Sequence, residues 1–311
     1  MDKYNMIPSI LDLIRWKNLL MIALVQWLIK YALLKPFGVS MSLNGFEFIL
    51  LMVATICIAA AGNVINDIYD VETDEINKPE KVIIGKHISE KTAYNLFIIL
   101  NVLGMAIGFY LSNIVAKSGL FSIFVIISVL LYVYASYLKR TLLIGNIVIS
   151  ILVALSIIIV GIFELIPAIT PQNQGIQLTF FKILLDYALF AFILNFLREI
   201  IKDIEDIDGD YKVGMQTLPI VLGRDRALKL LFALSFIPLL LIVFYIVNTL
   251  YKQPIAVIYF LVLIVAPLIY TIIKIAYSKT KKDFQIISNL FKLVMLFGML
   301  SMLLYKYVLL S

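Results

Sequence analysis

Residues 63–79 read NVINDIYDVETDEINKP and follow directly on an uninterrupted apolar run, residues 48–61. Asn66, Asp70 and Asp74 are spaced i, i+4 and i+8, so a helix of about 3.6 residues per turn places their side chains on one face. Carboxylates at the end of an apolar helix are costly unless a cation offsets their charge. Hard oxygen ligands on one face therefore predict a Mg²⁺ site where a membrane helix meets water.

A second acidic run has the same setting. Residues 198–210 read REIIKDIEDIDGD, again directly after an apolar run, residues 187–197, and Asp206 and Asp210 are spaced i, i+4. One acidic run by itself is equally compatible with a solvated loop that ends a membrane helix. Two runs in the same setting favour a site for a metal ion and a diphosphate that is built from both.

The composition is that of an integral membrane protein. Of the 311 residues, 62% are hydrophobic and 15% are charged. The mean hydropathy of +1.02 leaves too little polar surface to cover a soluble globule. With Cys57 and His87 as the only residues of their kinds, the chain can form no internal disulfide, thiolate zinc site or histidine cluster, so carboxylates must hold any metal. The net charge of +6 comes from basic residues beside the apolar spans, which fits a membrane surface and not a nucleic acid.

We expect an all-α, polytopic membrane protein in which nine transmembrane helices surround a central cavity. Each expected span is an apolar stretch of roughly 20 residues. The stretches are 17–35, 46–66, 93–112, 119–138, 143–165, 180–200, 228–249, 254–275 and 288–309. The first apolar run is too long for a signal peptide and lacks a small-residue cleavage site, so we expect it to remain as a span. The chain, residues 1–311, is expected to be one domain with cap loops at about 67–92 and 201–227.

The two acidic runs also suggest an internal repeat. Each ends the second helix of a four-helix set, and residues 83–89 after the first run resemble residues 221–226 after the second. We therefore expect two related four-helix halves plus one further helix, with both acidic runs at the same depth. Two unrelated helix-capping loops are the alternative.

Lysine and arginine are unevenly distributed over the connections between the spans. With the N-terminus in the cytoplasm, the even-numbered connections carry most of them. The opposite side has only Lys30, Lys35, Lys117, Lys182, Lys252 and Lys306. This asymmetry predicts that both acidic runs lie on the cytoplasmic side of the cell membrane.

Three segments carry a resemblance to a known family. The first is Asn66-Asp67-x-x-Asp70-x-x-x-Asp74 with INKP at residues 76–79, and the second is Asp206-x-x-x-Asp210 with KVGMQTLP at residues 212–219. The third is the basic segment YASYLKR, residues 134–140. Together they resemble the motifs of the UbiA-type intramembrane prenyltransferases, whose basic segment contacts diphosphate. Motif order and span number agree as well, so the resemblance covers nearly the whole chain.

The resemblance implies that both acidic motifs hold Mg²⁺ and the diphosphate of a polyprenyl donor, in a cavity that opens to the lipid bilayer. The implied metal ligands are Asn66, Asp70, Asp74, Asp206 and Asp210, with Asp67 as a further catalytic carboxylate. Fixed cations should match the charge that develops on the leaving group. The candidates for contacts to the diphosphate are Lys81, Lys139, Arg140, Lys202, Asn63 and Asp203.

The acceptor is less well defined by the motifs. Residues 198–210 look most like the archaeal-type branch that prenylates geranylgeranylglyceryl phosphate to form an ether lipid. The phosphate of such an acceptor needs a second basic pocket, for which the sequence offers Arg15, Lys17, Lys86 and Lys212. Prenylation of an aromatic acceptor in quinone biosynthesis, 4-hydroxybenzoate or dihydroxynaphthoate, is the alternative within the same enzyme class.

Two other classes of membrane protein also use buried acids. A transporter is a distant alternative, because its acids typically lie in the middle of a span, whereas these lie at helix ends beside basic loops. The CDP-alcohol phosphotransferases have a contiguous signature of aspartates that this chain lacks. The pattern therefore favours a prenyltransferase over both.

Overall fold

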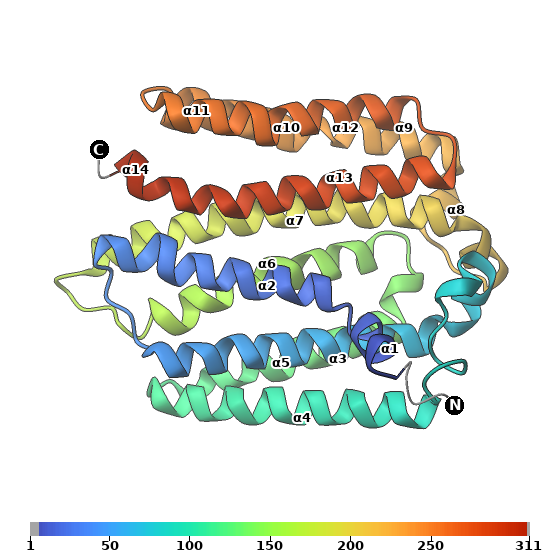
Figure 1. Ribbon diagram of the computed structural model, residues 1–311, viewed down its shortest axis with the longest axis horizontal. Helices are drawn as coiled ribbons and strands as arrows, with labels where there is room; N and C mark the ends of the chain where they lie inside the picture. Colours follow the sequence, from blue (N-terminus) through green and yellow to red (C-terminus); the bar gives the residue numbers. More distant parts are fainter. Residues whose placement is uncertain (1–5, 310–311) are drawn as a thin grey trace.

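The computed structural model describes residues 6–309, which form a bundle of long helices lying side by side (Figure 1). All nine expected spans are present in this part of the chain. Helices α2 to α7 form one span each, and the last three spans consist of α9 with α10, α11 with α12, and α13 with α14. The structure confirms an all-helical, polytopic fold, while the two related halves stay a prediction. The helices are α1 Met6–Leu13, α2 Trp16–Leu28, α3 Gly45–Asn77, α4 Glu90–Ile114, α5 Phe121–Ser136, α6 Ile144–Glu164, α7 Gln174–Lys212, α8 Leu218–Leu222, α9 Arg224–Leu234, α10 Phe236–Tyr245, α11 Pro254–Phe260, α12 Ala266–Ala276, α13 Lys281–Leu300 and α14 Tyr305–Leu309.

Local sequence signals set where several helices begin. The Asn44 side chain accepts a hydrogen bond from Glu47 N over 3.0 Å, and the Glu47 carboxylate accepts one from Asn44 N over 2.7 Å, so the pair caps α3. Thr280 and Asp283 form the same capping box at the start of α13. Each box satisfies amide groups that have no partner inside the helix.

Two spans are interrupted near a proline. Pro238 is in the first turn of α10, which Ser235 separates from α9, and Pro267 is the second residue of α12, behind a π-type turn at residues 261–265. Proline has no amide hydrogen, so it fits the first turn of a helix and disrupts the interior. Pro238 and Pro267, which fall inside two of the expected spans, therefore both lie in the first turn of a helix.

The segments expected as cap loops are partly helical. Helix α3 continues through the first acidic run to Asn77, and α7 continues through the second to Lys212, so the irregular chain begins only beyond these residues. Within α3, Asn66 Nδ2 donates to Asp70 Oδ2, one turn later, over 2.5 Å. Both acidic runs therefore lie on helices and not on loops.

Helices α3 and α7, which carry the acidic runs, are interior helices. Helix α3 packs against α2, α4 and α5, and α7 packs against α6, α9 and α13, while α3 and α7 also touch each other. The outer helix α4 exposes large apolar side chains, as at Ile98, Ile99 and Val102, which suits contact with lipid. Both acidic runs end on the side of the bundle that carries α1 and α8, which we call the motif end (Figure 1).

Candidate active site

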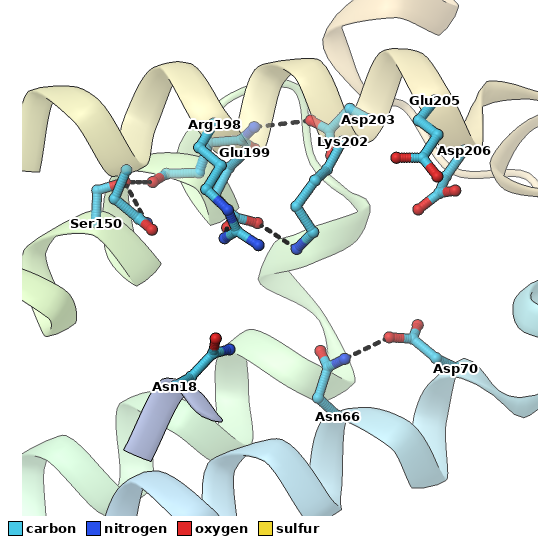
Figure 2. Close-up of polar contacts among 12 residues, drawn as sticks. Asn18, Asn66, Asp70, Ser150, Arg198, Glu199, Lys202, Asp203, Glu205 and Asp206 are labelled. Carbon is cyan, nitrogen blue, oxygen red and sulfur yellow. Dashed lines mark hydrogen bonds and ion pairs between the residues drawn. The ribbon is translucent and has the colours of Figure 1, made fainter. Parts of the chain in front are cut away.

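A cavity of about 1030 Å³ lies between the helices at the motif end and is lined by both acidic runs. Figure 2 shows Asn66 and Asp70 on one side of a gap and Asp206 on the other. The helical spacing thus directs the acids of each helix toward a shared space. Six aspartates reach it from α3 and α7, namely Asp67, Asp70, Asp74, Asp203, Asp206 and Asp210.

Asn77, the last residue of α3, fastens the two acidic helices together. Its Nδ2 donates to Asp206 O over 2.8 Å, and Gly209 N donates to Asn77 Oδ1 over 2.9 Å. Gly209 leaves room for this contact, because a Cβ at that position would lie 2.4 Å from Asn77 Nδ2. The contact sets the distance between the two acidic faces.

The α3 face is paired with two basic residues. Arg15 Nη2 bonds Asp67 Oδ1 over 2.6 Å, and Lys139 Nζ bonds Asp70 Oδ1. Asp67 raises the pKa of the Arg15 guanidinium, whereas burial lowers the pKa of the Lys139 ammonium and Asp70 opposes that shift. Because water is largely excluded from Lys139, whose side chain is 8% exposed, its ammonium attracts an anion in the cavity more strongly than a surface charge does.

On the α7 face, the paired basic residue is Lys78. Its Nζ lies 2.7 Å from Asp206 Oδ1 and 3.1 Å from Glu205 Oε1. Burial disfavours the charge of Lys78, but Asp206 and Glu205 more than offset this, so its pKa lies above the ordinary value. A lysine that directly follows α3 therefore neutralises acids of α7.

The carboxylates fit a magnesium ion that is held together with a phosphate ligand. Among residues 6–309, no three acidic, histidine or cysteine side chains converge closely enough to form a metal site by themselves. Mg²⁺ usually takes only one or two carboxylates, together with substrate phosphates and waters. The available ligand atoms are the side-chain oxygens that line the cavity from α3 and α7. They belong to Asn66, Asp70, Asp74, Asp206 and Asp210.

Most of the predicted site residues line the cavity. Two of them already have neutral partners, since Asn63 Nδ2 donates to Ile14 O over 2.9 Å and Asp203 Oδ2 accepts from Asn146 Nδ2 over 2.7 Å. The predicted residues that line the cavity are Arg15, Lys17, Asn63, Asn66, Asp67, Asp70, Asp74, Lys81, Lys139, Lys202, Asp203, Asp206 and Asp210.

The structure places Arg140, Lys86 and Lys212 outside the cavity lining, so their roles in binding substrate stay predictions. All three are exposed. Arg140 ends a short turn, Leu138–Arg140, in which the preceding residue, Lys139, lines the cavity. Lys86 sits on an exposed turn, where its Nζ donates to a backbone carbonyl over 2.7 Å. Lys212 follows Asp210 by two residues, and this spacing turns it to the far side of α7.

The cavity is also lined by six charged residues that the sequence analysis did not select as site residues: Asp12, Lys78, Glu80, Arg198, Glu199 and Lys292. Lys292 carries the clearest signal, because a lysine inside an apolar span is costly and indicates a functional role. Arg198 and Glu199 stand at the start of the second acidic run. Arg198 faces the cavity because Arg198, Lys202 and Asp206 are spaced i, i+4 and i+8 and so share one face of α7.

The chain matches known proteins over most of its length. The model of the UbiA prenyltransferase family matches residues 21–304. A digeranylgeranylglyceryl phosphate synthase of Methanosphaera stadtmanae is 31% identical over 259 residues, which are 82% of this chain and 86% of that protein. One of Methanococcoides burtonii is 31% identical over 296 residues, which are 94% of this chain and 97% of that protein.

Solved structures share the fold. A structure described as a digeranylgeranylglyceryl phosphate synthase in membranes has a TM-score of 0.60 at 24% identity, over 96% of this chain and 99% of that chain. A UbiA homologue from Archaeoglobus fulgidus, bound to DMAPP and Mg²⁺, has a TM-score of 0.51 at 20% identity, over 95% of this chain and 99% of that chain. The shared fold, the two acidic faces and the family match over residues 21–304 lead to one conclusion: this chain belongs to the UbiA prenyltransferase family.

Proposed function

We propose that this protein is a Mg²⁺-dependent prenyltransferase that transfers a geranylgeranyl group from its diphosphate to the free hydroxyl of geranylgeranylglyceryl phosphate, an ether-lipid precursor. The observation that carries the proposal is the cavity in which two facing acidic runs meet a set of basic side chains. The name of the two relatives supports this acceptor. In the reaction the donor's C–O bond to diphosphate breaks, a C–O bond to the glycerol oxygen forms, and the hydroxyl proton is released.

The acidic runs are proposed to hold the metal and the donor diphosphate. Asn66, Asp70 and Asp74 on α3, with Asp206 and Asp210 on α7, supply oxygen ligands from both sides of the cavity. When bound, Mg²⁺ offsets the negative charge that develops on the diphosphate as the allylic C–O bond breaks. The A. fulgidus homologue bound to DMAPP and Mg²⁺ supports this assignment by fold analogy.

We expect Lys139→Met to lower kcat/KM for the donor about 10- to 100-fold, because a buried ammonium beside Asp70 is placed to bond the diphosphate. Steady-state kinetics with varied geranylgeranyl diphosphate measures the effect. Lys91→Met, at an exposed position in the first turn of α4, removes a lysine at the motif end as a control. An unchanged donor KM and rate in Lys139→Met would leave this lysine only a role in membrane topology.

We expect Gly209→Ala to lower the rate about 10- to 100-fold, because the added Cβ pushes α7 away from Asn77 and separates the two acidic faces. Gly175→Ala is the matched control, since Gly175 lies on the same helix with no neighbouring atom within 4 Å of its added Cβ. Initial rates of diphosphate release compare the two variants. Equal rates would show that the Asn77 contact does not set the geometry of the site.

Away from the acidic runs the cavity wall becomes apolar. Phe124, Leu131, Leu152 and Met299 are among the residues that line it. Such a wall suits a polyprenyl chain, and it keeps water away from the allylic carbocation until the acceptor captures it. The same cavity can therefore hold the donor chain and protect the reacting carbon.

The motif end is proposed to face the cytoplasm across the cell membrane. The connections at this end carry most of the chain's basic residues, as the positive-inside rule requires of a cytoplasmic face. A cysteine placed at the exposed position Lys86 tests the orientation. A membrane-impermeant thiol reagent should modify it only after the cells are opened, and modification in intact cells would reverse the orientation.

The acceptor is tested by incubating purified protein, Mg²⁺ and labelled geranylgeranyl diphosphate with three acceptors in parallel. These are geranylgeranylglyceryl phosphate, 4-hydroxybenzoate and dihydroxynaphthoate. We expect an ether product with the first alone. Product with an aromatic acceptor alone would overturn the proposed acceptor and leave the prenyltransferase activity standing, and uptake of a solute without diphosphate release would indicate a transporter.

A further inference from the structure

Three basic side chains gather in the cavity beside the acidic runs. Arg198 and Lys202 reach it from α7, and Lys292 reaches it from α13. Figure 2 shows Arg198, Glu199 and Lys202 projecting from α7 into the space that Asn18 of α2 faces from the other side. Lys292 is close enough to Arg198 and Lys202 for their charges to repel one another.

The positive charge of this cluster is not balanced. Glu199 is the carboxylate that bonds it, accepting from Arg198 Nη1 over 3.0 Å and from Lys202 Nζ over 2.9 Å. Lys292 Nζ has a neutral partner, Asn18 Oδ1, at 3.3 Å. Arg198 Nε is buried and has no hydrogen-bond partner within the described residues. Unpaired donors and excess charge are costly inside a membrane protein, so the cluster is built to receive an anion.

The cluster is distinct from the metal site. Arg198, Lys202, Asp206 and Asp210 follow one another at intervals of four residues and form a single stripe on α7. Helical rise places Lys202 about 6 Å and Arg198 about 12 Å from Asp206 along the axis. The carboxylate half of the stripe suits a diphosphate that arrives with Mg²⁺, whereas the basic half suits an anion without a metal.

We propose that Arg198, Lys202 and Lys292 bind the phosphate monoester of the acceptor, next to the site of prenyl transfer. This inference rests on the proposed function, in which the acceptor is a prenylglyceryl phosphate. Guanidinium and ammonium donors from two helices, α7 and α13, match the oxygens of a phosphate group, whereas an aromatic carboxylate needs a single cation. In such an acceptor the phosphate and the reacting hydroxyl are on adjacent glycerol carbons. Binding the phosphate on the basic half of the stripe therefore brings the hydroxyl toward the donor carbon on the other half.

The test compares Lys292→Met with Lys292→Arg and with a control, Lys282→Met, an exposed lysine on the same helix. We expect Lys292→Met to raise the KM for geranylgeranylglyceryl phosphate about tenfold or more and to leave the KM for geranylgeranyl diphosphate within about twofold. Lys292→Arg should restore most of the acceptor affinity, and Lys282→Met should behave as wild type. An unchanged acceptor KM, or an equal rise in donor KM, would overturn the assignment.

A second acceptor without a phosphate separates direct contact from a structural role. With geranylgeranylglycerol, Lys292→Met and wild type should turn over at similar, low efficiency, because the group that Lys292 binds is absent. An equal loss with both acceptors would show that Lys292 does not contact the phosphate.

Arg198→Lys is the second variant, to be used if Lys292→Met does not fold. It keeps the positive charge and removes Nε, and we expect it to raise the KM for the acceptor and not the KM for the donor. If the wild-type enzyme prenylates only an aromatic acceptor, both the proposed function and this subsite are wrong. If the wild-type enzyme forms the ether and both variants have a normal KM for the acceptor, the subsite alone is wrong.

Discussion

Asp70→Ala and Asp206→Ala are each expected to reduce prenyl transfer at least about 10³-fold. The two carboxylates face the same cavity from α3 and α7, and each is paired with a lysine, Lys139 or Lys78. Without either carboxylate, one side of the cavity no longer holds the metal, and the charge on the departing diphosphate is left partly uncompensated. Diphosphate release by the purified variants at saturating Mg²⁺ and donor measures the loss.

Glu72→Ala is the matched control for both substitutions. Glu72 lies two residues from Asp70 on the same helix, but it is exposed and outside the cavity lining, so we expect a wild-type rate. Thermal unfolding in detergent checks that all three variants retain the fold. Turnover of Asp70→Ala within about tenfold of wild type would remove Asp70 from the metal site, because the loss of a needed charge stabiliser costs more than that.

Glu164→Ala is expected to destabilise the fold by about 3–5 kcal/mol. Glu164 ends α6 on the side of the bundle opposite the motif end, and its Oε1 lies 2.6 Å from Lys30 Nζ, with side chains 0% and 5% exposed. Its Oε2 accepts from Leu43 N over 3.1 Å, and Lys30 also donates to Leu43 O over 2.7 Å. Removing the carboxylate leaves a buried ammonium without a counter-ion, and this accounts for most of the expected cost.

A double substitution separates the charge from the packing. Lys30→Met combined with Glu164→Leu replaces both ions by apolar side chains of similar volume and should recover most of the lost stability. The free energy of unfolding in denaturant, measured in detergent for Glu164→Ala and for the double variant, compares the two losses of stability. Wild-type stability in Glu164→Ala would show that the ion pair adds nothing. A double variant as unstable as the single would assign the loss to packing.

The amino-acid sequence by itself determined the helices and the acidic faces. Both depend on residues that are neighbours along the chain, since a span needs only a long enough apolar stretch and a face needs only the helical period. Asn66, Asp70 and Asp74 share a face of α3 whatever surrounds that helix. The sequence also determined the chemical class of any metal ligand. With only one cysteine and one histidine, a site with several ligands must use mainly oxygen atoms.

Only the tertiary structure decided which charged groups meet. Lys139 lines the cavity and the next residue, Arg140, does not, although both are basic and stand in the same segment. Lys30 and Glu164 are 134 residues apart and pair in the interior, and Lys292 joins the cations of α7 only because α13 packs against that helix. The physical reason is that a local period specifies the direction of a side chain relative to its own helix, whereas the packing of helices distant in sequence determines what it faces.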